Sequence, residues 1–149
     1  MKRPFEIYFL FLLILFISTG AIYGGDSLIL SPDGSLLKIE ESWLDKLPFY
    51  NFLIPGIVLF LFLGIFPLTG LIGLFLRKNN RKLNVINIYK DKYWGWSFTL
   101  YSGIISVIWI AFQQLLTGYF VLQPIIAGTG ILIIIFCLTP RVQKYYTLI

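Results

Sequence analysis

Residues 52–76 read FLIPGIVLFLFLGIFPLTGLIGLFL, a run of twenty-five residues without a charged side chain. At about 1.5 Å of rise per residue, a helix of this length exceeds a hydrocarbon core about 30 Å thick. An acidic, turn-rich segment precedes the run, and the basic segment RKNNRK follows it. The run therefore predicts a membrane-spanning helix over residues 53–76, and its flanks indicate how that helix is oriented.

The composition of the whole chain agrees with a membrane protein. The 149 residues are 58% hydrophobic and only 13% charged, with a mean hydropathy of +0.83. A soluble domain carries about 25% charged residues. This chain has too few charged side chains to cover a surface exposed to water. We expect one all-α transmembrane domain over residues 1–149.

Three further apolar stretches predict a four-transmembrane-helix bundle. The first, residues 5–23, also resembles a secretory signal with a small-residue cleavage site at Thr19-Gly20-Ala21, but its length and the spans that follow favour a membrane helix. Residues 97–117 form the third span. Residues 124–139 form the fourth, which is short for a full crossing.

The longest polar segment is the loop at residues 24–52, between the first and second spans. Ser31-Pro32-Asp33-Gly34 lies between two short apolar runs and has the residue types of a tight turn, which predicts a small β-hairpin. Residues 42–45 have capping-box spacing and predict a short helix along the membrane interface, ending before Pro48.

The distribution of basic residues predicts the topology. Ten of the twelve lysine and arginine residues lie at the N-terminus, in the loop at 77–96 or in the C-terminal tail. The positive-inside rule then places both termini and the basic loop in the cytoplasm, and loop 24–52 outside the cell membrane. For the basic residues of loop 77–96, anionic lipid headgroups are a simpler partner than nucleic acid.

The residue inventory argues against most catalytic chemistry. The chain has no histidine and one cysteine, Cys137, which excludes an internal disulfide and leaves no histidine to activate a serine or cysteine. No ionisable residue lies deep in a predicted span, which argues against an ion-coupled pump. The carboxylates of loop 24–52 keep an enzyme acting on a lipid-linked substrate as a third hypothesis. Their spacing predicts no metal site, and we expect no cofactor.

Small residues recur on single faces of the predicted helices. Small-residue faces within a membrane indicate close helix packing. Proline at position 67 also predicts a kink in the second span, because it frees the carbonyl of Leu63. The expected packing residues are Gly56, Gly64, Pro67, Gly70, Ser102, Ser106, Ala127 and Gly130.

A group of aromatic and amide residues lies at the outer ends of the predicted spans and in loop 24–52. Aromatic walls with a few polar groups are typical of pockets for small molecules or lipids. The alternative is that the two glutamines simply form hydrogen bonds between helices. The candidate ligand-binding residues are Trp43, Tyr50, Asn51, Trp109, Gln113, Thr117, Tyr119 and Gln123.

Several short motifs carry a resemblance. These motifs are the Gly24-Gly25 pair, the turn at residues 31–35, the segment Pro48-Phe49 through Pro55-Gly56 and, as a weaker match, residues 122–124. They resemble a group of small uncharacterised bacterial four-span membrane proteins. The similarity covers residues 20–75. It implies the four-span topology and a bacterial origin, and it implies no activity.

From the sequence we expect a non-catalytic membrane protein that acts as an accessory subunit or self-associating module through its outer cap and helix faces. Its partners are the lipid bilayer and another membrane protein or itself. The alternative is a binder of a lipid or small hydrophobic ligand in an outer-leaflet pocket.

Overall fold

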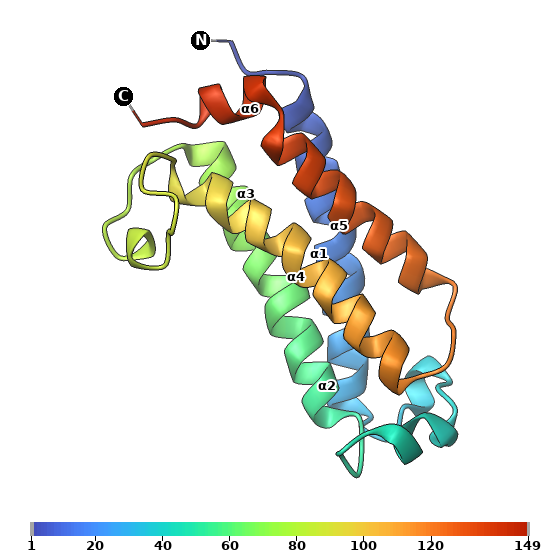
Figure 1. Ribbon diagram of the computed structural model, residues 1–149. Helices are drawn as coiled ribbons and strands as arrows, with labels where there is room; N and C mark the ends of the chain where they lie inside the picture. Colours follow the sequence, from blue (N-terminus) through green and yellow to red (C-terminus); the bar gives the residue numbers. More distant parts are fainter. Residues whose placement is uncertain (1, 149) are drawn as a thin grey trace.

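The computed structural model describes residues 2–148, and nearly all of its regular structure is helical (Figure 1). Four long helical segments follow one another along the chain, joined by short helices and loops. The elements are α1 Glu6–Leu30, η1 Ser35–Leu37, η2 Glu41–Lys46, α2 Leu53–Val58, η3 Leu59–Ile65, α3 Phe66–Leu76, η4 Leu83–Val85, α4 Trp94–Leu116, α5 Leu122–Leu138 and α6 Pro140–Tyr145.

Within residues 2–148, three helices are long and apolar enough to cross a membrane: Glu6–Leu30, Leu53–Leu76 and Trp94–Leu116. The second of these contains α2, η3 and α3 without a break. Its middle part, η3, is π-helical and ends two residues before Pro67. Proline cannot donate to the preceding turn, and the wider π-helical turns lie just ahead of it. The kink expected at Pro67 stays a prediction.

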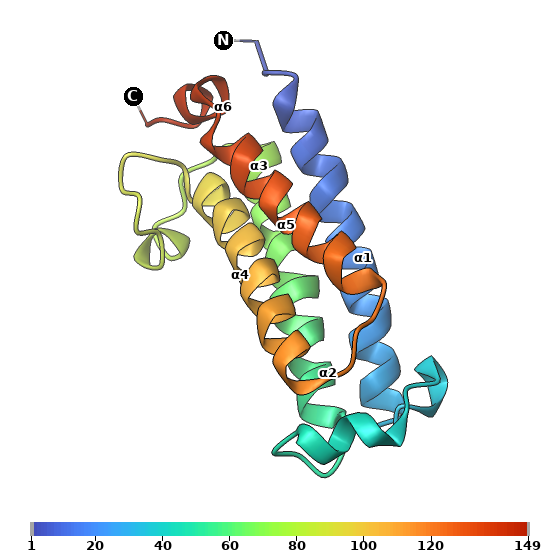
Figure 2. The same ribbon diagram turned by 45° about the vertical axis from the view of Figure 1, so that its right-hand side comes forward.

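The long segments pack side by side. Helix α1 packs on α2, η3 and α5, while α4 packs on α3 and α5, as Figures 1 and 2 show. Both termini and loop 77–93 lie at one end, called the basic end below (Figure 1). Residues 31–52 lie at the opposite end and are called the cap.

Glycines allow the helix backbones to approach closely. A Cβ atom on Gly95 of α4 would overlap the backbone of Gly73 of α3. A Cβ on Gly25 of α1 would lie 2.7 Å from the Phe60 Cβ and 2.8 Å from the Gly56 carbonyl oxygen. A residue larger than glycine would not fit at these contacts. The positions of α1 to α4 therefore depend on them.

Most of the expected packing residues lie at such contacts. A Cβ on Gly56, Gly64, Gly70 or Gly130 would meet Leu28, Ile22, Thr99 or the Gly103 carbonyl oxygen within 2.7–3.1 Å. Ser102 and Ser106 are buried and donate to carbonyl oxygens within α4, at 2.7 and 2.8 Å. Pro67 is buried and Ala127 is half-buried.

The predicted β-hairpin is corrected. No strand is found among the described residues, and only one isolated antiparallel bridge, Lys92 to Thr147, occurs. The turn at residues 31–34 is present, with Gly34 at a φ of 80°, but residues 28–30 belong to α1 and residues 35–37 form the 3₁₀ helix η1. The predicted short helix after the turn corresponds to η2, which is also 3₁₀.

The boundaries of the predicted spans also shift. Helix α1 continues to Leu30, so the loop begins at residue 31 instead of 24. Gly24 and Gly25, interpreted from the sequence as the start of a loop, lie inside the helix, where they let α2 and η3 approach. The helix ends where residue 31 precedes Pro32, a position that disfavours helical backbone. The third segment covers 94–116 and the fourth 122–138.

At the basic end, loop 77–93 and the tail are tied to the helices by hydrogen bonds. The buried Asn87 side chain donates to the Lys92 carbonyl at 2.9 Å and accepts from Ser97 Oγ at 2.6 Å. Tyr146 Oη donates to the Leu74 carbonyl at 2.8 Å, and the Tyr93 amide donates to the Tyr146 carbonyl at 3.0 Å. The loop and the tail therefore form one folded layer over this end.

The contact between Gly73 and Gly95 makes a prediction. The substitution Gly95→Ala should lower the free energy of unfolding by about 1–3 kcal/mol, because the added methyl forces two backbones apart. Gly128→Ala is the matched control, since a Cβ there meets nothing within 4 Å. Unfolding in mixed detergent micelles, titrated with a denaturing detergent, measures both. Equal stability of the two variants would contradict the close contact.

Candidate ligand pocket

An apolar cavity of about 240 Å³ lies at the cap end, between the cap and the ends of three helical segments. Helix α4 packs on α3 and η3 more extensively than on α2, so a space remains between α2 and α4 near the cap. The cavity is lined by Leu28, Ile39, Trp43, Leu47, Phe49, Phe52, Ile54, Pro55, Val58, Leu59, Trp109, Phe112, Gln113, Leu116 and Thr117.

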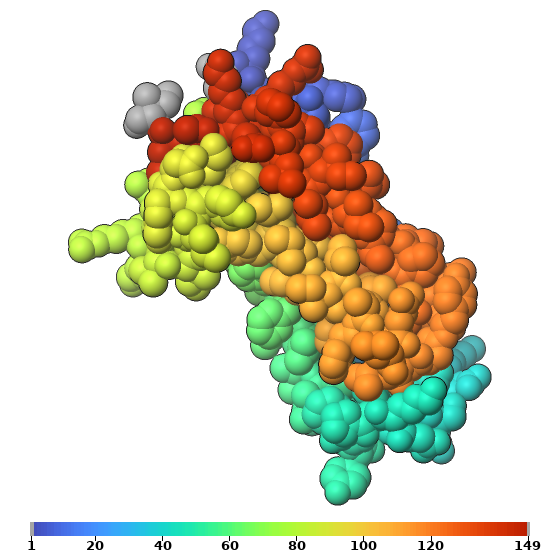
Figure 3. All heavy atoms as spheres, in the orientation of Figure 1, coloured from blue at the N-terminus to red at the C-terminus, as the bar shows by residue number. Residues whose placement is uncertain are grey.

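The cap is held over this space by a few specific contacts. The Phe52 amide donates to the Pro32 carbonyl at 2.8 Å, which joins the two ends of the cap. The Phe52 side chain is buried. The ring of Trp43 meets that of Phe120 edge-on, with centroids 6.2 Å apart. Figure 3 shows the cap lying against the end of α4.

The turn at residues 31–35 is organised by one carboxylate. Asp33 Oδ1 accepts from Ser31 Oγ at 2.6 Å, from the Ser35 amide at 3.1 Å and from Ser35 Oγ at 2.8 Å. These hydrogen bonds, the one from Ser31 first, lower the pKa of Asp33 below its ordinary value. The acidic side chain thus stabilises the fold of the cap itself.

Four of the eight candidate ligand residues line the cavity together. Trp109, Gln113 and Thr117 are spaced by four residues on α4 and therefore lie on one face, and Trp43 reaches the cavity from the cap. Thr117 Oγ1 donates to the Gln113 carbonyl at 2.9 Å. The half-buried Gln113 side-chain amide makes no hydrogen bond to any other residue in the described part of the chain. It is one of the cavity's free polar groups, together with the indole N–H groups of Trp43 and Trp109, which make no hydrogen bond within residues 2–148.

The other four candidate residues are elsewhere. Gln123 is fully buried: its Oε1 accepts from the Phe120 amide at 3.2 Å and its Nε2 donates to the Gly118 carbonyl at 3.3 Å. It closes the turn between α4 and α5. Tyr50 and Tyr119 are exposed to solvent or lipid. Asn51 Oδ1 accepts from the Leu53 amide at 3.1 Å, at the start of α2.

Sequence reasoning missed most of the cavity wall. Eleven of the fifteen lining residues were not among the candidates, and nearly all of these are aliphatic or aromatic. In a chain whose spans are apolar on every face, such residues carry no signal that separates a cavity wall from a lipid-facing surface. The hydrogen bond from the Phe52 amide to the Pro32 carbonyl, which folds the cap back on itself, is seen only in the tertiary structure.

The cavity carries no acidic side chain. Over residues 2–148, no group of three or more histidine, cysteine or acidic residues is placed to hold a metal ion. The cavity therefore provides apolar contact from its aromatic and aliphatic walls, and its polar groups are the Gln113 amide, the Thr117 hydroxyl and the indole N–H groups of Trp43 and Trp109.

Comparison of the chain with protein-family models, with curated proteins and with solved structures finds no match. The resemblance of residues 20–75 to small bacterial four-span proteins stays a prediction from the sequence.

The Asp33 turn predicts a pH dependence of the cap. Because the folded pKa is lowered, the turn's stabilisation is present above the ordinary value of 3.8 and is lost as the pH falls through the folded pKa. The NMR signal of the Ser35 amide should titrate with a midpoint below 3.8. The variant Asp33→Asn should abolish this titration. A midpoint at or above 3.8 would show that the hydrogen bonds do not form.

The two glutamines should respond differently to the same substitution. Gln123→Leu leaves the Phe120 amide without its partner and removes one of the two donors to the Gly118 carbonyl, and it should cost about 1–3 kcal/mol of unfolding free energy. Gln113→Leu, which breaks no side-chain hydrogen bond, should change stability by less than about 0.5 kcal/mol. Denaturant titration in micelles compares them, and similar losses for both would contradict the assigned roles.

Proposed function

We propose that this chain is a non-catalytic integral membrane protein that holds one lipid acyl chain, or a hydrophobic molecule of similar size, in the cavity beneath the cap. The observation that carries the proposal is the convergence of Trp43, Trp109, Gln113 and Thr117 on one apolar cavity. Cavities of this kind bind apolar groups through their walls and orient them through a few polar atoms.

The size of the cavity narrows the ligand class. Pockets for drug-sized molecules have volumes of about 300–1,000 Å³. A cavity of about 240 Å³ is smaller, which favours part of a lipid chain over a complete drug-sized molecule. Burial of apolar area contributes roughly 25 cal/mol per Å², and both aromatic and aliphatic side chains supply that area here. The Gln113 amide would then meet a carbonyl or hydroxyl group of the ligand.

In this proposal the chain crosses the bacterial cell membrane four times. Helix α5, with 17 residues, is about 26 Å long and slightly shorter than the hydrocarbon core. The exposed residues Tyr119, Phe120 and Val121 extend its apolar surface at the cap end. Ten of the twelve basic residues lie at one end of the molecule, in the two terminal segments and loop 77–93 (Figure 1). This distribution supports a cytoplasmic location for that end.

A second candidate function is an accessory or self-associating subunit that docks through the cap. The supporting observation is Tyr50, a large aromatic residue of the cap that is fully exposed. Aromatic residues of this kind are enriched at binding hot spots. In this case the cavity would be a packing defect, and a partner would cover Tyr50.

Filling the cavity tests the first proposal. The substitution Val58→Phe places a ring in the cavity wall, whereas Ile57→Phe adds the same ring at the exposed neighbouring position. Native mass spectrometry of gently purified protein should detect a retained hydrophobic mass. Its occupancy should fall severalfold in Val58→Phe and persist in Ile57→Phe. Retention that is equal in both variants would exclude the cavity as the binding site.

The same spectra address the second candidate. A protein partner or a second copy of the chain, lost in Tyr50→Ser and retained in Tyr119→Ser, would favour docking through the cap. Tyr119 is the matched control because it is an exposed tyrosine at the same end of the molecule.

A further inference from the structure

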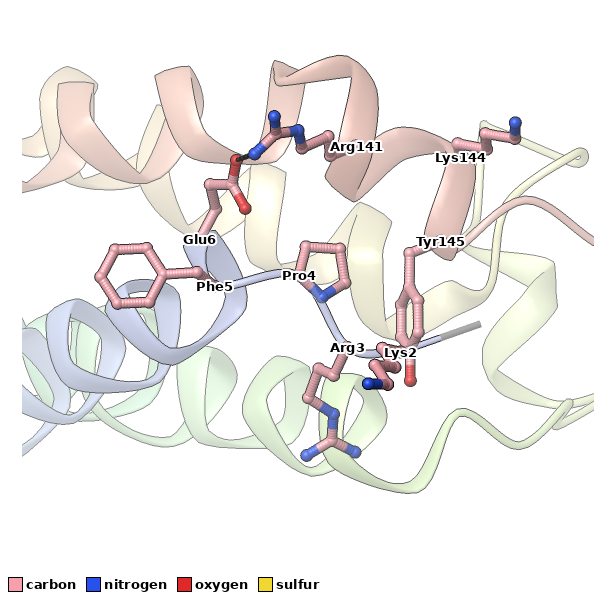
Figure 4. Close-up of a pocket in the computed structure, with 8 residues that line it drawn as sticks. All are labelled: Lys2, Arg3, Pro4, Phe5, Glu6, Arg141, Lys144 and Tyr145. Atoms are coloured by element: carbon pink, nitrogen blue, oxygen red, sulfur yellow. Dashed lines mark ion pairs between the residues drawn. The ribbon is translucent and has the colours of Figure 1, made fainter.

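A second cavity, of about 330 Å³, lies at the basic end of the molecule. It is formed between the N-terminal segment that leads into α1 and helix α6 (Figure 4). Its lining residues are Lys2, Arg3, Pro4, Phe5, Glu6, Arg141, Lys144 and Tyr145. We propose that this cavity binds a phosphate group, supplied by an anionic lipid headgroup or by free phosphate.

The charge of the cavity is strongly one-sided. Four cationic side chains surround it, and Glu6 is the only acidic residue in its lining. Glu6 Oε1 lies 3.7 Å from Arg141 Nη1, so this carboxylate is already engaged with one of the four cations. Lys2, Arg3 and Lys144 have no carboxylate partner among residues 2–148, so the lining keeps an excess of positive charge that attracts an anion.

Arg3 is fixed in place by contacts that leave its charge uncompensated. Its Nη2 donates to the Phe75 carbonyl at 3.3 Å, and its guanidinium lies 5.7 Å from the centre of the Phe11 ring and 5.4 Å from that of Phe75. A guanidinium has five N–H donors. The Phe75 carbonyl takes one of them, and a hydrogen bond with the Tyr145 side chain, which raises the pKa of Arg3, takes another. The residue therefore keeps several donors for the planar, bidentate recognition that phosphate oxygens favour.

Lys2 and Lys144 are the cations with no competing partner. Both are exposed, and within residues 2–148 neither side chain takes part in an ion pair or a hydrogen bond. They belong to different elements, Lys2 to the N-terminal segment and Lys144 to α6, and in Figure 4 the Lys144 side chain points away from Lys2. Because both side chains are exposed and unpaired, they can turn toward a phosphate bound in the cavity. A phosphate between them would join the first residues of the chain to its C-terminal helix.

The surroundings of the cavity fit a lipid headgroup in particular. Phe5 lines the cavity, is largely exposed and packs edge-on with Phe9, at 4.8 Å between centroids. Phe9 in turn stacks on Phe136 of α5, at 5.6 Å. A lipid whose phosphate occupied the cavity could place its chains along this aromatic surface, next to the cationic cluster.

The experiment uses the full chain in a non-ionic detergent, in the Val58→Phe background so that the cap cavity is filled. The probes are dioctanoyl phosphatidylglycerol, dioctanoylglycerol, which has the same chains without phosphate, and inorganic phosphate. Native mass spectrometry should show saturable binding of the phospholipid and much weaker binding of dioctanoylglycerol. Displacement by millimolar inorganic phosphate would identify the free ion as a source, and no displacement would identify the lipid headgroup.

Paired substitutions locate the site. Lys2→Gln combined with Lys144→Gln should weaken phospholipid binding about tenfold or more. Lys78→Gln combined with Lys82→Gln removes the same charge from exposed positions in loop 77–93 and should leave binding unchanged. Circular dichroism verifies that the variants fold. The same binding measurement on the single variants Lys2→Gln and Lys144→Gln gives the separate contribution of each lysine.

Three results would overturn the proposal: no saturable binding of either phosphate compound, equal binding of dioctanoylglycerol, or equal losses in the two paired variants. The last result would show a general electrostatic attraction without a defined site.

Discussion

Close contact between helix backbones at glycine is the constraint on which the rest of this structure depends. In an apolar environment helices gain little from burying side chains against one another, so association relies on close van der Waals packing. Gly25 brings α1 against α2 and η3, Gly73 and Gly95 join α3 to α4, and Gly103 and Gly130 join α4 to α5. A side chain at any of these positions would separate two backbones.

These contacts also explain where the apolar cavity lies. Helices α1 and α2 meet closely at Gly25 and Gly56, and α3 and α4 meet at Gly73 and Gly95, at the opposite end. Helix α4 therefore approaches the second segment near the basic end and packs less on it near the cap. Bulky residues such as Trp109 and the cap fill part of the resulting space, and the cavity is what remains.

The two ends of the molecule differ in chemistry because their charges are segregated. The cap end has an apolar cavity with a few uncharged polar groups, while the basic end has a second cavity lined by four cationic residues. At the basic end, burial raises the pKa of Tyr146, whose hydroxyl donates to the Leu74 carbonyl and ties the tail to α3. Together, the two proposals describe a protein that contacts lipid at both ends in different ways.

The sequence by itself determined the helical class, the long apolar helices and the faces of small residues, because helix period and apolar length are local properties of the chain. It also placed Trp109, Gln113 and Thr117 on one face. Only the tertiary structure decided that Gly24 and Gly25 lie within a helix, that residues 35–37 form a 3₁₀ turn instead of a strand, and that Gln123 is bonded while Gln113 is free. Those outcomes depend on which backbone lies next to each residue, and that neighbour comes from a distant part of the chain.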